Sequence, residues 1–497
     1  MRSTPPTPLP LPRSSVSNPH YDVVVIGSGP GGYIAAARAG ALGLKVAVVE
    51  KDKQLGGTCL HRGCIPTKAM LHTADIVSEL KEASRMGVSV EGVKVEWEKV
   101  LGHKRQVVTS NAGGVAHLMK HRKVDVIQGF GRVAVAGGKK TVIARDADGK
   151  ETALSTDSVV LAVGSKPREL PFAKFDGERI VSSDHLLDAN HEAVKKIPGT
   201  FAILGGGVIG IEFASLFQRL GTKVTVLEML PRIVAPADPD SSKLLADELS
   251  KQGCDIKTEV KVTSIERKGN EVVTQYQNKD GTTATLTTEY ILVAVGRPPL
   301  TQGIGLETTK AQTDKAGFVV VDGMMESAEP GLYAIGDCIN TPWLAHVASA
   351  EGMIAVEHIA WKKGLTKTKP AALNYDHTPS CVYSEPPLAW AGLTEDEAKE
   401  RGHAVKVAKF DFAKNAKAAI LLKKRGFVKF VVDAQYGEIL GCHIVGPQAT
   451  DLLAEPALAI SAELPIEELA RTVHAHPTLY EAIWEAASIA AGRAAHG

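Results

Sequence analysis

Residues 21–32 read YDVVVIGSGPGG, and this stretch decides how the first part of the chain folds. The apolar, β-branched run at 21–26 predicts a buried parallel strand, and the alanine-rich segment that follows as far as Ala41 predicts a helix. Between strand and helix lies a Gly-x-Gly-x-x-Gly turn, formed by Gly27, Gly29 and Gly32. Such glycines let backbone N–H groups and the helix N-terminus approach a pyrophosphate. The stretch therefore predicts a dinucleotide-binding unit.

The same arrangement occurs a second time in the chain. A strand predicted at 45–49 ends in Glu50, and a strand predicted at 223–227 ends in Glu228. In both copies the acid lies 23 positions after the first glycine of the turn, where its carboxylate suits ribose hydroxyls. The second turn contains Gly205, Gly207, Val208, Ile209 and Gly210. The sequence therefore predicts two dinucleotide sites.

Two further segments match each other and indicate the fold class. Residues 158–167 and 290–299 each combine an apolar run with a glycine and a following proline. Each is predicted to be a late strand and turn that complete one nucleotide-binding unit. The predicted fold is therefore α/β, with two Rossmann-like domains.

Residues 56–68, GGTCLHRGCIPTK, carry two cysteines five positions apart. The spacing of Cys59 and Cys64 allows a disulfide, and a bridge that closes so short a loop stabilises a fold weakly. A bridge of small structural value suits reversible opening, and the charge of Lys68 would favour a thiolate. Two buried free thiols, or half of a zinc site, are the alternatives that this segment alone leaves open.

Two dinucleotides beside a cysteine pair predict an electron relay. The first cofactor has to exchange electrons with sulfur and with a nicotinamide, and a flavin can do both, so FAD is predicted in the first unit. Glu228 would bind both free ribose hydroxyls and repel a 2′-phosphate, which favours NAD in the second unit, although Arg232 nearby could weaken this preference. The apolar segment 331–337 ends in Asp337, which is predicted to bind the ribityl or phosphate region of the flavin; a turn aspartate is the alternative.

The composition bears on location and partners. A net charge of +1 gives no electrostatic footprint for nucleic acid or anionic membrane, and no run approaches 18 uninterrupted apolar residues. Four of the six cysteines are scattered singly, which fits a reducing compartment and predicts a cytoplasmic location. Residues 1–20 predict a disordered tail, because their prolines oppose the amphipathic helix of a transit peptide.

The pattern changes at about residue 371 to an α+β unit without a phosphate-binding motif. The run 427–433 predicts a strand, Tyr436-Gly437 predicts a hairpin, and helical segments follow from Gln448.

His476 stands near the end of this unit, with Glu481 five positions later to orient its imidazole. Thiol–disulfide exchange needs a base of this kind to form the attacking thiolate. A satisfied loop histidine or a metal ligand is the alternative. The segment offers no further metal ligands, so no metal site is predicted.

From Tyr21 to its end, the chain resembles the FAD-dependent pyridine nucleotide–disulfide oxidoreductases. Four motifs in the family's order carry the resemblance, namely GGTCLHRGCIPTK at 56–68, GGGVIGIEFA at 205–214, AIGD at 334–337 and HAHPTLYE at 474–481. Within the family the pattern is most similar to the enzymes that oxidise dihydrolipoyl groups with NAD. The resemblance implies FAD- and NAD-binding domains followed by a C-terminal α+β dimerisation domain.

The resemblance also implies roles for single residues. Cys59 matches the thiol that exchanges with the dithiol substrate, and Cys64 matches the thiol beside the flavin. Lys68 and Glu212 match an ion pair next to the reactive nitrogen of the flavin. The matches to family FAD contacts are Gly27, Gly29, Gly32, Glu50, Thr58, Lys68, Gly131, Gly164, Ser165, Asp337, Leu344, Ala345 and His346. The matches to NAD contacts are Gly205, Gly207, Val208, Ile209, Gly210, Glu212, Glu228, Val262 and Gly296.

In this family the base, matched here by His476 with Glu481, comes from the partner subunit. The resemblance therefore implies a homodimer with a shared active site. It implies as partners the lipoyl domains of 2-oxo acid dehydrogenase complexes or a glycine-cleavage carrier protein, and neither nucleic acid nor membrane. The implied division of the chain is a tail at 1–20, an FAD-binding domain at 21–167 and 298–370, an NAD-binding domain at 168–297, and an interface domain at 371–497.

Neighbouring members of the family are the alternatives. Mercuric reductases end in a cysteine pair, whereas the last cysteine here is Cys442. Glutathione reductases prefer NADP and carry an aromatic residue where Val208 stands, and soluble transhydrogenases lack one redox cysteine. A non-catalytic flavoprotein subunit is a further alternative, but no redox cysteine, base or acid is missing. One departure from many relatives is His61-Arg62 between the cysteines, where they carry Asn-Val; tuning of the redox potential is expected from it.

Overall fold

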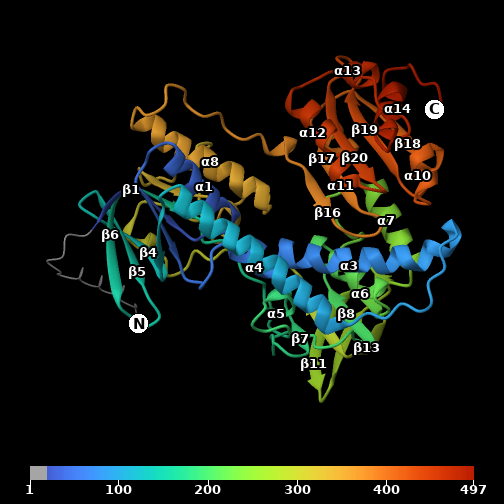
Figure 1. The fold of residues 1–497 in the computed structure, drawn as a ribbon, viewed down its shortest axis with the longest axis horizontal. Coiled ribbons are helices and arrows are strands. Elements are labelled where there is room, and N and C mark those ends of the chain that lie inside the picture. Colours follow the sequence, from blue (N-terminus) through green and yellow to red (C-terminus); the bar gives the residue numbers. More distant parts are fainter. Residues whose placement is uncertain (1–18, 497) are drawn as a thin grey trace.

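The computed structural model describes residues 19–496, and four sheets organise this part of the chain (Figure 1). The tail predicted at 1–20 lies outside the described residues except for its last two, and the first strand begins at His20.

The first unit contains the strand predicted at 21–26. Its sheet has the order β3-β2-β1-β6-β5-β4, and β15 also pairs with β6. Its strands are β1 (His20–Ile26), β2 (Val46–Glu50), β3 (Asp125–Gln128), β4 (Phe130–Ala136), β5 (Lys139–Arg145), β6 (Glu151–Leu161) and β15 (Leu332–Ala334). Its helices are α1 (Pro30–Ala41), α2 (Gly57–Arg62), α3 (Cys64–Glu82), α4 (Trp97–His121) and α8 (Ala345–Lys362), with the 3₁₀ turns η1 (Ala83–Met86), η2 (Leu306–Thr308) and η3 (Gly336–Cys338).

The register of this sheet brings distant segments to one edge. β2, β6 and β15 run parallel to β1 or to its neighbour, with Ile26 opposite Val49 and Leu161, and with Leu161 opposite Ala334. Parallel strands end at the same edge of a sheet, and ligands of such sheets bind beyond their carboxyl ends. The segments that follow β1, β2, β6 and β15 therefore meet at one place.

The second unit repeats the parallel arrangement. Its sheet has the order β10-β9-β8-β14-β7, and a separate antiparallel sheet has the order β11-β12-β13. The strands are β7 (Ile180–Val181), β8 (Thr200–Leu204), β9 (Lys223–Leu227), β10 (Asp255–Lys257), β11 (Lys261–Lys268), β12 (Glu271–Gln277), β13 (Thr283–Thr288) and β14 (Tyr290–Val293). The helices are α5 (Ser183–Leu187), α6 (Val208–Arg219) and α7 (Pro239–Lys251).

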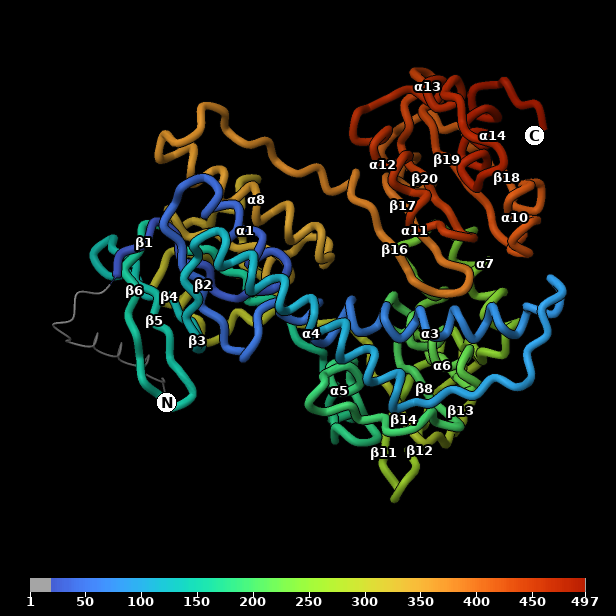
Figure 2. Tube along the Cα trace, viewed as in Figure 1, coloured from blue at the N-terminus to red at the C-terminus, as the bar shows by residue number. Residues whose placement is uncertain are grey.

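The C-terminal unit is an antiparallel sheet of order β16-β17-β20-β19-β18 with helices around it (Figure 1). The strands are β16 (Ser380–Val382), β17 (Leu388–Gly392), β18 (Val405–Asp411), β19 (Phe427–Asp433) and β20 (Ile439–Val445). The helical segments are η4 (Tyr375–His377), α9 (Glu395–Glu400), η5 (Phe412–Lys414), α10 (Ala416–Ile420), α11 (Ala449–Leu452), α12 (Ala454–Ser461), α13 (Ile466–Arg471) and α14 (Glu481–Ala490). Figure 2 shows the extended linker that carries the chain from α8 to β16.

The three units share buried surface. Met70 of α3 and Leu101 of α4 belong to one apolar cluster with Phe213 and Phe217 of α6 and with Phe427 of β19. Burying such side chains together is the main force that holds packed elements in place. The helical hairpin that follows the redox cysteines thus packs on the second unit, against which the C-terminal unit also lies.

The predicted α/β fold is confirmed, with its two parallel units and its C-terminal α+β unit. The hairpin predicted at Tyr436-Gly437 joins β19 to β20. The late strand predicted from residue 158 is longer than expected, because β6 starts at Glu151 and pairs with β5 over its first half. The implied domain boundaries stay a prediction.

Candidate active site

The redox segment consists of two helices joined at one glycine. Cys59 lies within α2, and Cys64 is the first residue of α3, directly after Gly63. Gly57 has a φ of 60°, and a Cβ there would lie 2.6 Å from the Cα of Gly29 in the first glycine turn. Only glycine permits this approach. The cysteines are therefore held against the predicted pyrophosphate-binding turn.

Cys59 and Cys64 are free thiols in the structure, so their pairing as a disulfide stays a prediction for the oxidised form. A hydrogen bond from the Cys59 side chain, together with the charge of Lys68, lowers the pKa of Cys64 to about 7 despite burial. The same hydrogen bond and burial raise the pKa of Cys59. In the dithiol form Cys64 therefore ionises before Cys59.

Lys68 and Glu212 form an ion pair that connects the first two units. The Lys68 Nζ lies 2.7 Å from both carboxylate oxygens of Glu212, which is buried on α6. A second contact brings in the C-terminal unit, because the backbone N–H of Tyr383 donates to Glu212 Oε1 at 3.2 Å. Lys68 and Glu212 lie 144 residues apart in the sequence, and the structure brings them together as the resemblance implied.

A cavity of about 1250 Å³ extends from the cysteines across the carboxyl edge of the first sheet. All thirteen residues matched to FAD contacts line it. A Cβ at Gly29 would meet no protein atom within 4 Å, so the glycine turn leaves open space in front of the N-terminus of α1. A space of this size, bounded by a helix N-terminus and by polar groups, fits a flavin dinucleotide.

Two carboxylates of the predicted FAD site are held by hydrogen bonds. Glu50 accepts the backbone N–H of Ser28 at 2.8 Å and its hydroxyl at 2.6 Å. Asp337 accepts the hydroxyl of Ser165 at 2.6 Å, across the gap between the segments that follow β6 and β15. These hydrogen bonds hold both carboxylates at the carboxyl edge of the first sheet.

The predicted NAD residues divide into two groups. Five of them, Gly207, Val208, Ile209, Glu212 and Gly296, line the same cavity, whereas Gly205, Gly210, Glu228 and Val262 do not. Glu228 is buried and accepts the backbone N–H groups of Gly206 at 2.5 Å and Leu230 at 2.7 Å. Arg232 is exposed and donates to the carbonyl of Ala235, so it does not pair with Glu228.

His476 and Glu481 form the expected pair in the C-terminal unit. The His476 Nδ1 lies 2.8 Å from Glu481 Oε1, and the His476 side chain is 72% exposed. Burial opposes the ionisation of Glu481, but the Thr478 N–H and His476 outweigh it and lower the pKa of Glu481. Neither His476 nor Glu481 lines the cavity of its own chain. The structure therefore does not bring the predicted base to the cysteines within one chain.

Several cavity residues were missed by the sequence analysis. Arg62 of α2 lies 2.6 Å from Asp52 and 3.7 Å from Asp184 of α5, and Arg297 lies 3.5 Å from Asp184. Arg62 had been noticed only as a departure from relatives, and the other partners are distant in sequence. Cys381 and Tyr383 enter the cavity from the C-terminal unit, and no local motif marks them.

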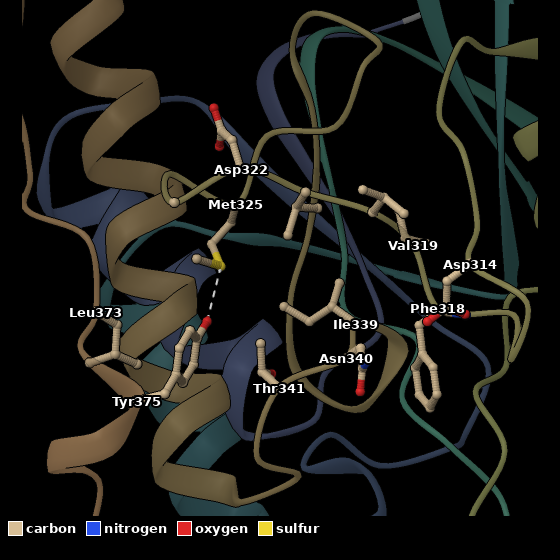
Figure 3. A pocket seen from close by; sticks show the side chains of 13 residues that line it. Asp314, Phe318, Val319, Asp322, Met325, Ile339, Asn340, Thr341, Leu373 and Tyr375 are labelled. Carbon is tan, nitrogen blue, oxygen red and sulfur yellow. Dashed lines mark hydrogen bonds between the residues drawn. The ribbon is translucent and has the colours of Figure 1, made fainter. Parts of the chain in front are cut away.

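A second cavity, of about 370 Å³, lies beside α8 (Figure 3). Apolar side chains such as Phe318 and Ile339 line it together with Tyr375 of the linker. The Tyr375 hydroxyl donates to the buried Glu351 at 3.0 Å. None of the predicted site residues lines this cavity. Over residues 19–496, no helix is long and apolar enough to cross a membrane, and no group of three or more His, Cys, Asp or Glu side chains is placed to hold a metal ion.

Known proteins resemble this chain over nearly its whole length. A family model described as pyridine nucleotide-disulphide oxidoreductase matches residues 21–352, and the dimerisation-domain model of the same name matches residues 378–487. The chain is 44% identical over 482 residues to a dihydrolipoyl dehydrogenase of Bacillus subtilis (96% of this chain, 99% of the relative). It is 39% identical over 484 residues to the mitochondrial dihydrolipoyl dehydrogenase of Dictyostelium discoideum (97% and 96%).

Solved structures show the same similarity. The chain superposes on LpdA from Mycobacterium tuberculosis with a TM-score of 0.86 and 26% identity, covering 95% of this chain and 99% of the other. It superposes on RclA, an HOCl-induced flavoprotein disulfide reductase from Escherichia coli, with a TM-score of 0.79 and 25% identity, covering 94% and 100%.

Proposed function

Because this chain belongs to the pyridine nucleotide-disulphide oxidoreductase family, we propose that it oxidises dihydrolipoyl groups to lipoyl groups and passes their electrons to NAD. It is an oxidoreductase that uses FAD and NAD, as its dihydrolipoyl dehydrogenase relatives do. One observation carries the proposal. The two cysteines, all thirteen residues matched to FAD and five of those matched to NAD line a single cavity.

Bound FAD supplies a two-electron relay between the cysteine sulfurs and the nicotinamide of NAD. Three carboxylates of the chain are proposed to bind the two cofactors of this relay. Glu50 and Asp337, held by hydrogen bonds to Ser28 and Ser165, would bind the hydroxyl-bearing parts of the flavin dinucleotide, and Glu228 would bind the free ribose hydroxyls of NAD. A 2′-phosphate would face the buried Glu228 carboxylate, which favours NAD over NADP.

We propose that the oxidised enzyme carries a disulfide between Cys59 and Cys64. A substrate thiolate attacks the Sγ of Cys59, a mixed disulfide forms, and Cys64 leaves as a thiolate. The second substrate thiolate then attacks the substrate sulfur of the mixed disulfide, so that the lipoyl disulfide forms and Cys59 leaves as a thiolate, which takes up one of the two protons that the substrate thiols lost. The electron pair of the substrate now resides on the enzyme dithiol, with the negative charge on Cys64 near Lys68.

The substrate thiols must lose their protons before they attack, and His476 oriented by Glu481 is the proposed proton acceptor. His476 lies outside the cavity of its own chain, and this supports a base supplied by the partner subunit's His476. The chain contains the dimerisation domain of the family at residues 378–487, and a homodimer fits this domain.

Three further parts of the proposal follow from the function. The partners are the lipoyl domains of 2-oxo acid dehydrogenase complexes or a glycine-cleavage carrier protein, since these present dihydrolipoyl groups. A cytoplasmic location fits the few scattered cysteines. The domains are those implied by the sequence, with residues 298–370 completing the FAD-binding domain that starts at residue 21; the pairing of β15 with β6 supports this return of the chain.

An anaerobic titration of the purified flavoprotein tests the function. Dihydrolipoamide is added first and NAD second, and the visible spectrum of the flavin is followed. Dihydrolipoamide should change the flavin spectrum, and NAD should restore it. If dihydrolipoamide leaves the spectrum unchanged while glutathione and NADPH act on it, the chain is a glutathione-reductase-like enzyme and the proposed substrate is wrong.

A further inference from the structure

Tyr383 directly follows strand β16 of the C-terminal unit and lines the cavity that contains Cys59 and Cys64. No role proposed above uses this residue. Its position is notable because the C-terminal unit otherwise reaches the cavity mainly through apolar or small side chains such as Cys381, Leu453 and Ala457.

Tyr383 contacts both members of the ion pair beside the cysteines. The Lys68 Nζ lies 4.5 Å from the centroid of the Tyr383 ring, within the distance at which an ammonium is attracted to an aromatic face. The backbone N–H of Tyr383 donates to Glu212 Oε1 at 3.2 Å. One residue of the C-terminal unit therefore touches the cation with its ring and the anion with its backbone.

The backbone around Tyr383 is fixed to helix α6. Two residues further on, the N–H of Glu385 donates to the hydroxyl of Ser215 at 3.1 Å. Ser215 lies one turn after Glu212, so the two bonds fasten the segment along one face of α6. Gln252 adds a third bond, donating to the Glu385 carbonyl at 2.8 Å. Tyr383 is 39% exposed as a residue, but hydrogen bonds to Glu212 and Ser215 hold the backbone of its segment on α6.

Lys68 is the cation that acts on Cys64. The hydrogen bond from Cys59 lowers the pKa of Cys64 most, and the charge of Lys68 lowers it further, whereas burial and Glu212 raise it. The other titratable groups that act on the cysteines or on Tyr383 are Tyr33, Cys59, Glu212, Cys381 and Asp451. None of these is a cation, so Lys68 supplies the positive charge that favours the Cys64 thiolate.

We propose that Tyr383 is a positioning residue for the thiol chemistry: its ring covers the Lys68 ammonium at Glu212 and so keeps the charge that favours the thiolate of Cys64. A ring over the ammonium excludes water from one side, and charges act more strongly on each other where water is excluded. How readily Cys64 ionises thus depends on the packing of the C-terminal unit against α6. This inference rests on the roles proposed above for Cys59 and Cys64.

A spectroscopic pH titration tests the inference. The flavoprotein is reduced anaerobically with dithiothreitol, so that the test does not depend on the dihydrolipoyl substrate. The long-wavelength absorbance that a thiolate produces beside an oxidised flavin is then followed against pH. The midpoint of the unchanged protein is expected near pH 7. In Tyr383→Leu it should move up by about 1 pH unit, since the Lys68 charge would act on Cys64 through water.

Two other variants separate the ring from the rest of the side chain. Tyr383→Phe keeps the ring over Lys68 and should titrate as the unchanged protein does. Tyr383→Met fills much of the same space without a ring and should shift like Tyr383→Leu, which provides a second test if the leucine variant fails to fold. Tyr436→Leu removes an exposed tyrosine from the β19–β20 hairpin and serves as the matched control. Flavin content and the thermal unfolding midpoint are measured for every variant.

The outcomes are distinguishable. An unchanged midpoint in both Tyr383→Leu and Tyr383→Met, or a midpoint that moves to lower pH because Cys64 becomes better hydrated, would overturn the role of Tyr383. A shift in Tyr383→Phe equal to that in Tyr383→Leu would assign the effect to the hydroxyl and overturn it as well. If the unchanged protein shows no long-wavelength absorbance at any pH, Cys64 forms no thiolate beside the flavin, and both this role and the inference about Tyr383 are wrong.

Discussion

At the scale of single residues, the ionisation of Cys64 depends on several effects that oppose one another. Burial disfavours its thiolate, and the nearby Glu212 carboxylate disfavours it further, while the Cys59 hydrogen bond and the Lys68 ammonium favour it. The net result is a pKa of about 7, at which the thiolate forms near neutral pH. A thiol poised there can gain and lose its charge at little cost during exchange.

Replacing Lys68 by methionine should raise the pKa of Cys64. The variant removes the favourable cation and leaves the buried Glu212 carboxylate beside the thiol, and both changes disfavour the thiolate. We expect an upward shift of at least about 1 pH unit. The measurement is the ultraviolet absorbance of the thiolate in the reduced protein against pH, with Cys64→Ser to identify the signal.

Lys81→Met is the matched control, because Lys81 lies on the same helix α3 but outside the cavity and donates to the Arg219 carbonyl. It should leave the titration unchanged. Equal curves for Lys68→Met and Lys81→Met would show that Lys68 does not set the charge of Cys64.

The residue scale also shows what local sequence can and cannot predict. Cys59, Cys64 and Lys68 stand within ten positions of one another, so their chemistry was visible as a pattern. Glu212 came only from the resemblance to the family, since nothing in the neighbourhood of Lys68 indicates a partner on α6. Tyr383 was missed, because its contacts arise only where the C-terminal unit packs on the second unit.

At the scale of elements, a buried ion cluster joins the C-terminal sheet to the second unit. Asp238 caps the N-terminus of α7 by accepting the N–H groups of Asp240 and Ser241. The Lys429 Nζ of β19 lies 2.7 Å from Asp238, and both side chains are buried. Lys429 also lies 3.3 Å from the more exposed Asp240, so ion pairs join the N-terminus of α7 to the strand.

Lys429→Met should destabilise the protein strongly. The methionine leaves the Asp238 carboxylate buried without its cation, a change that costs about 3–5 kcal/mol in comparable pairs. Lys424→Met provides the control, since Lys424 is exposed in the loop before β19, and its effect should stay within about 0.5 kcal/mol. The free energy of unfolding from urea denaturation of the flavoprotein checks both values. Similar losses for the two variants would contradict a stabilising role for the cluster.

The elements with strong sequence signals were those with apolar runs or glycine turns. The strands β1, β2 and β9 were predicted close to their observed bounds because parallel strands covered on both faces are largely apolar. The antiparallel sheet β11-β12-β13 was not predicted. A strand such as β11 (KVTSIERK) contains mostly polar residues and no apolar run that would mark it in the sequence. It forms because its backbone pairs with β12, which in turn pairs with β13.

At the scale of the whole molecule, the distribution of the proposed reacting groups favours a base supplied by a second subunit. Cys59 and Cys64 line the cavity, but His476 lies on the surface of the C-terminal unit with 72% of its side chain exposed. Two apolar residues of the same unit are strongly exposed, namely Val473, three positions before this histidine, at 94% and Leu458 of α12 at 70%. Such a surface fits an interface between subunits. The sequence predicts His476 as the base, but only the fold shows that it lies outside the cavity of its own chain.

A mixed dimer tests whether the base acts across the interface. One chain carries Cys59→Ser with a first affinity tag, the other carries His476→Ala with a second tag, and purification over both tags isolates the heterodimer. Each variant alone should be nearly inactive. In the heterodimer, the intact Cys59 faces the intact His476 of the partner subunit at one site, while the other site lacks both groups. Because the two sites of a symmetric dimer are equivalent, the heterodimer should recover about half of the wild-type activity per flavin.

The alternative arrangement gives a different result with the same protein. If each chain used its own His476, one site of the heterodimer would lack the thiol and the other would lack the base, so no activity would return. Glu481→Gln in place of His476→Ala refines the test. Glu481 holds the imidazole Nδ1 at 2.8 Å, so its loss should reduce the rate without abolishing it. The mixed dimer of Cys59→Ser and Glu481→Gln should again work at about half of the wild-type activity, because the single site with an intact thiol then draws on an unaltered His476–Glu481 pair.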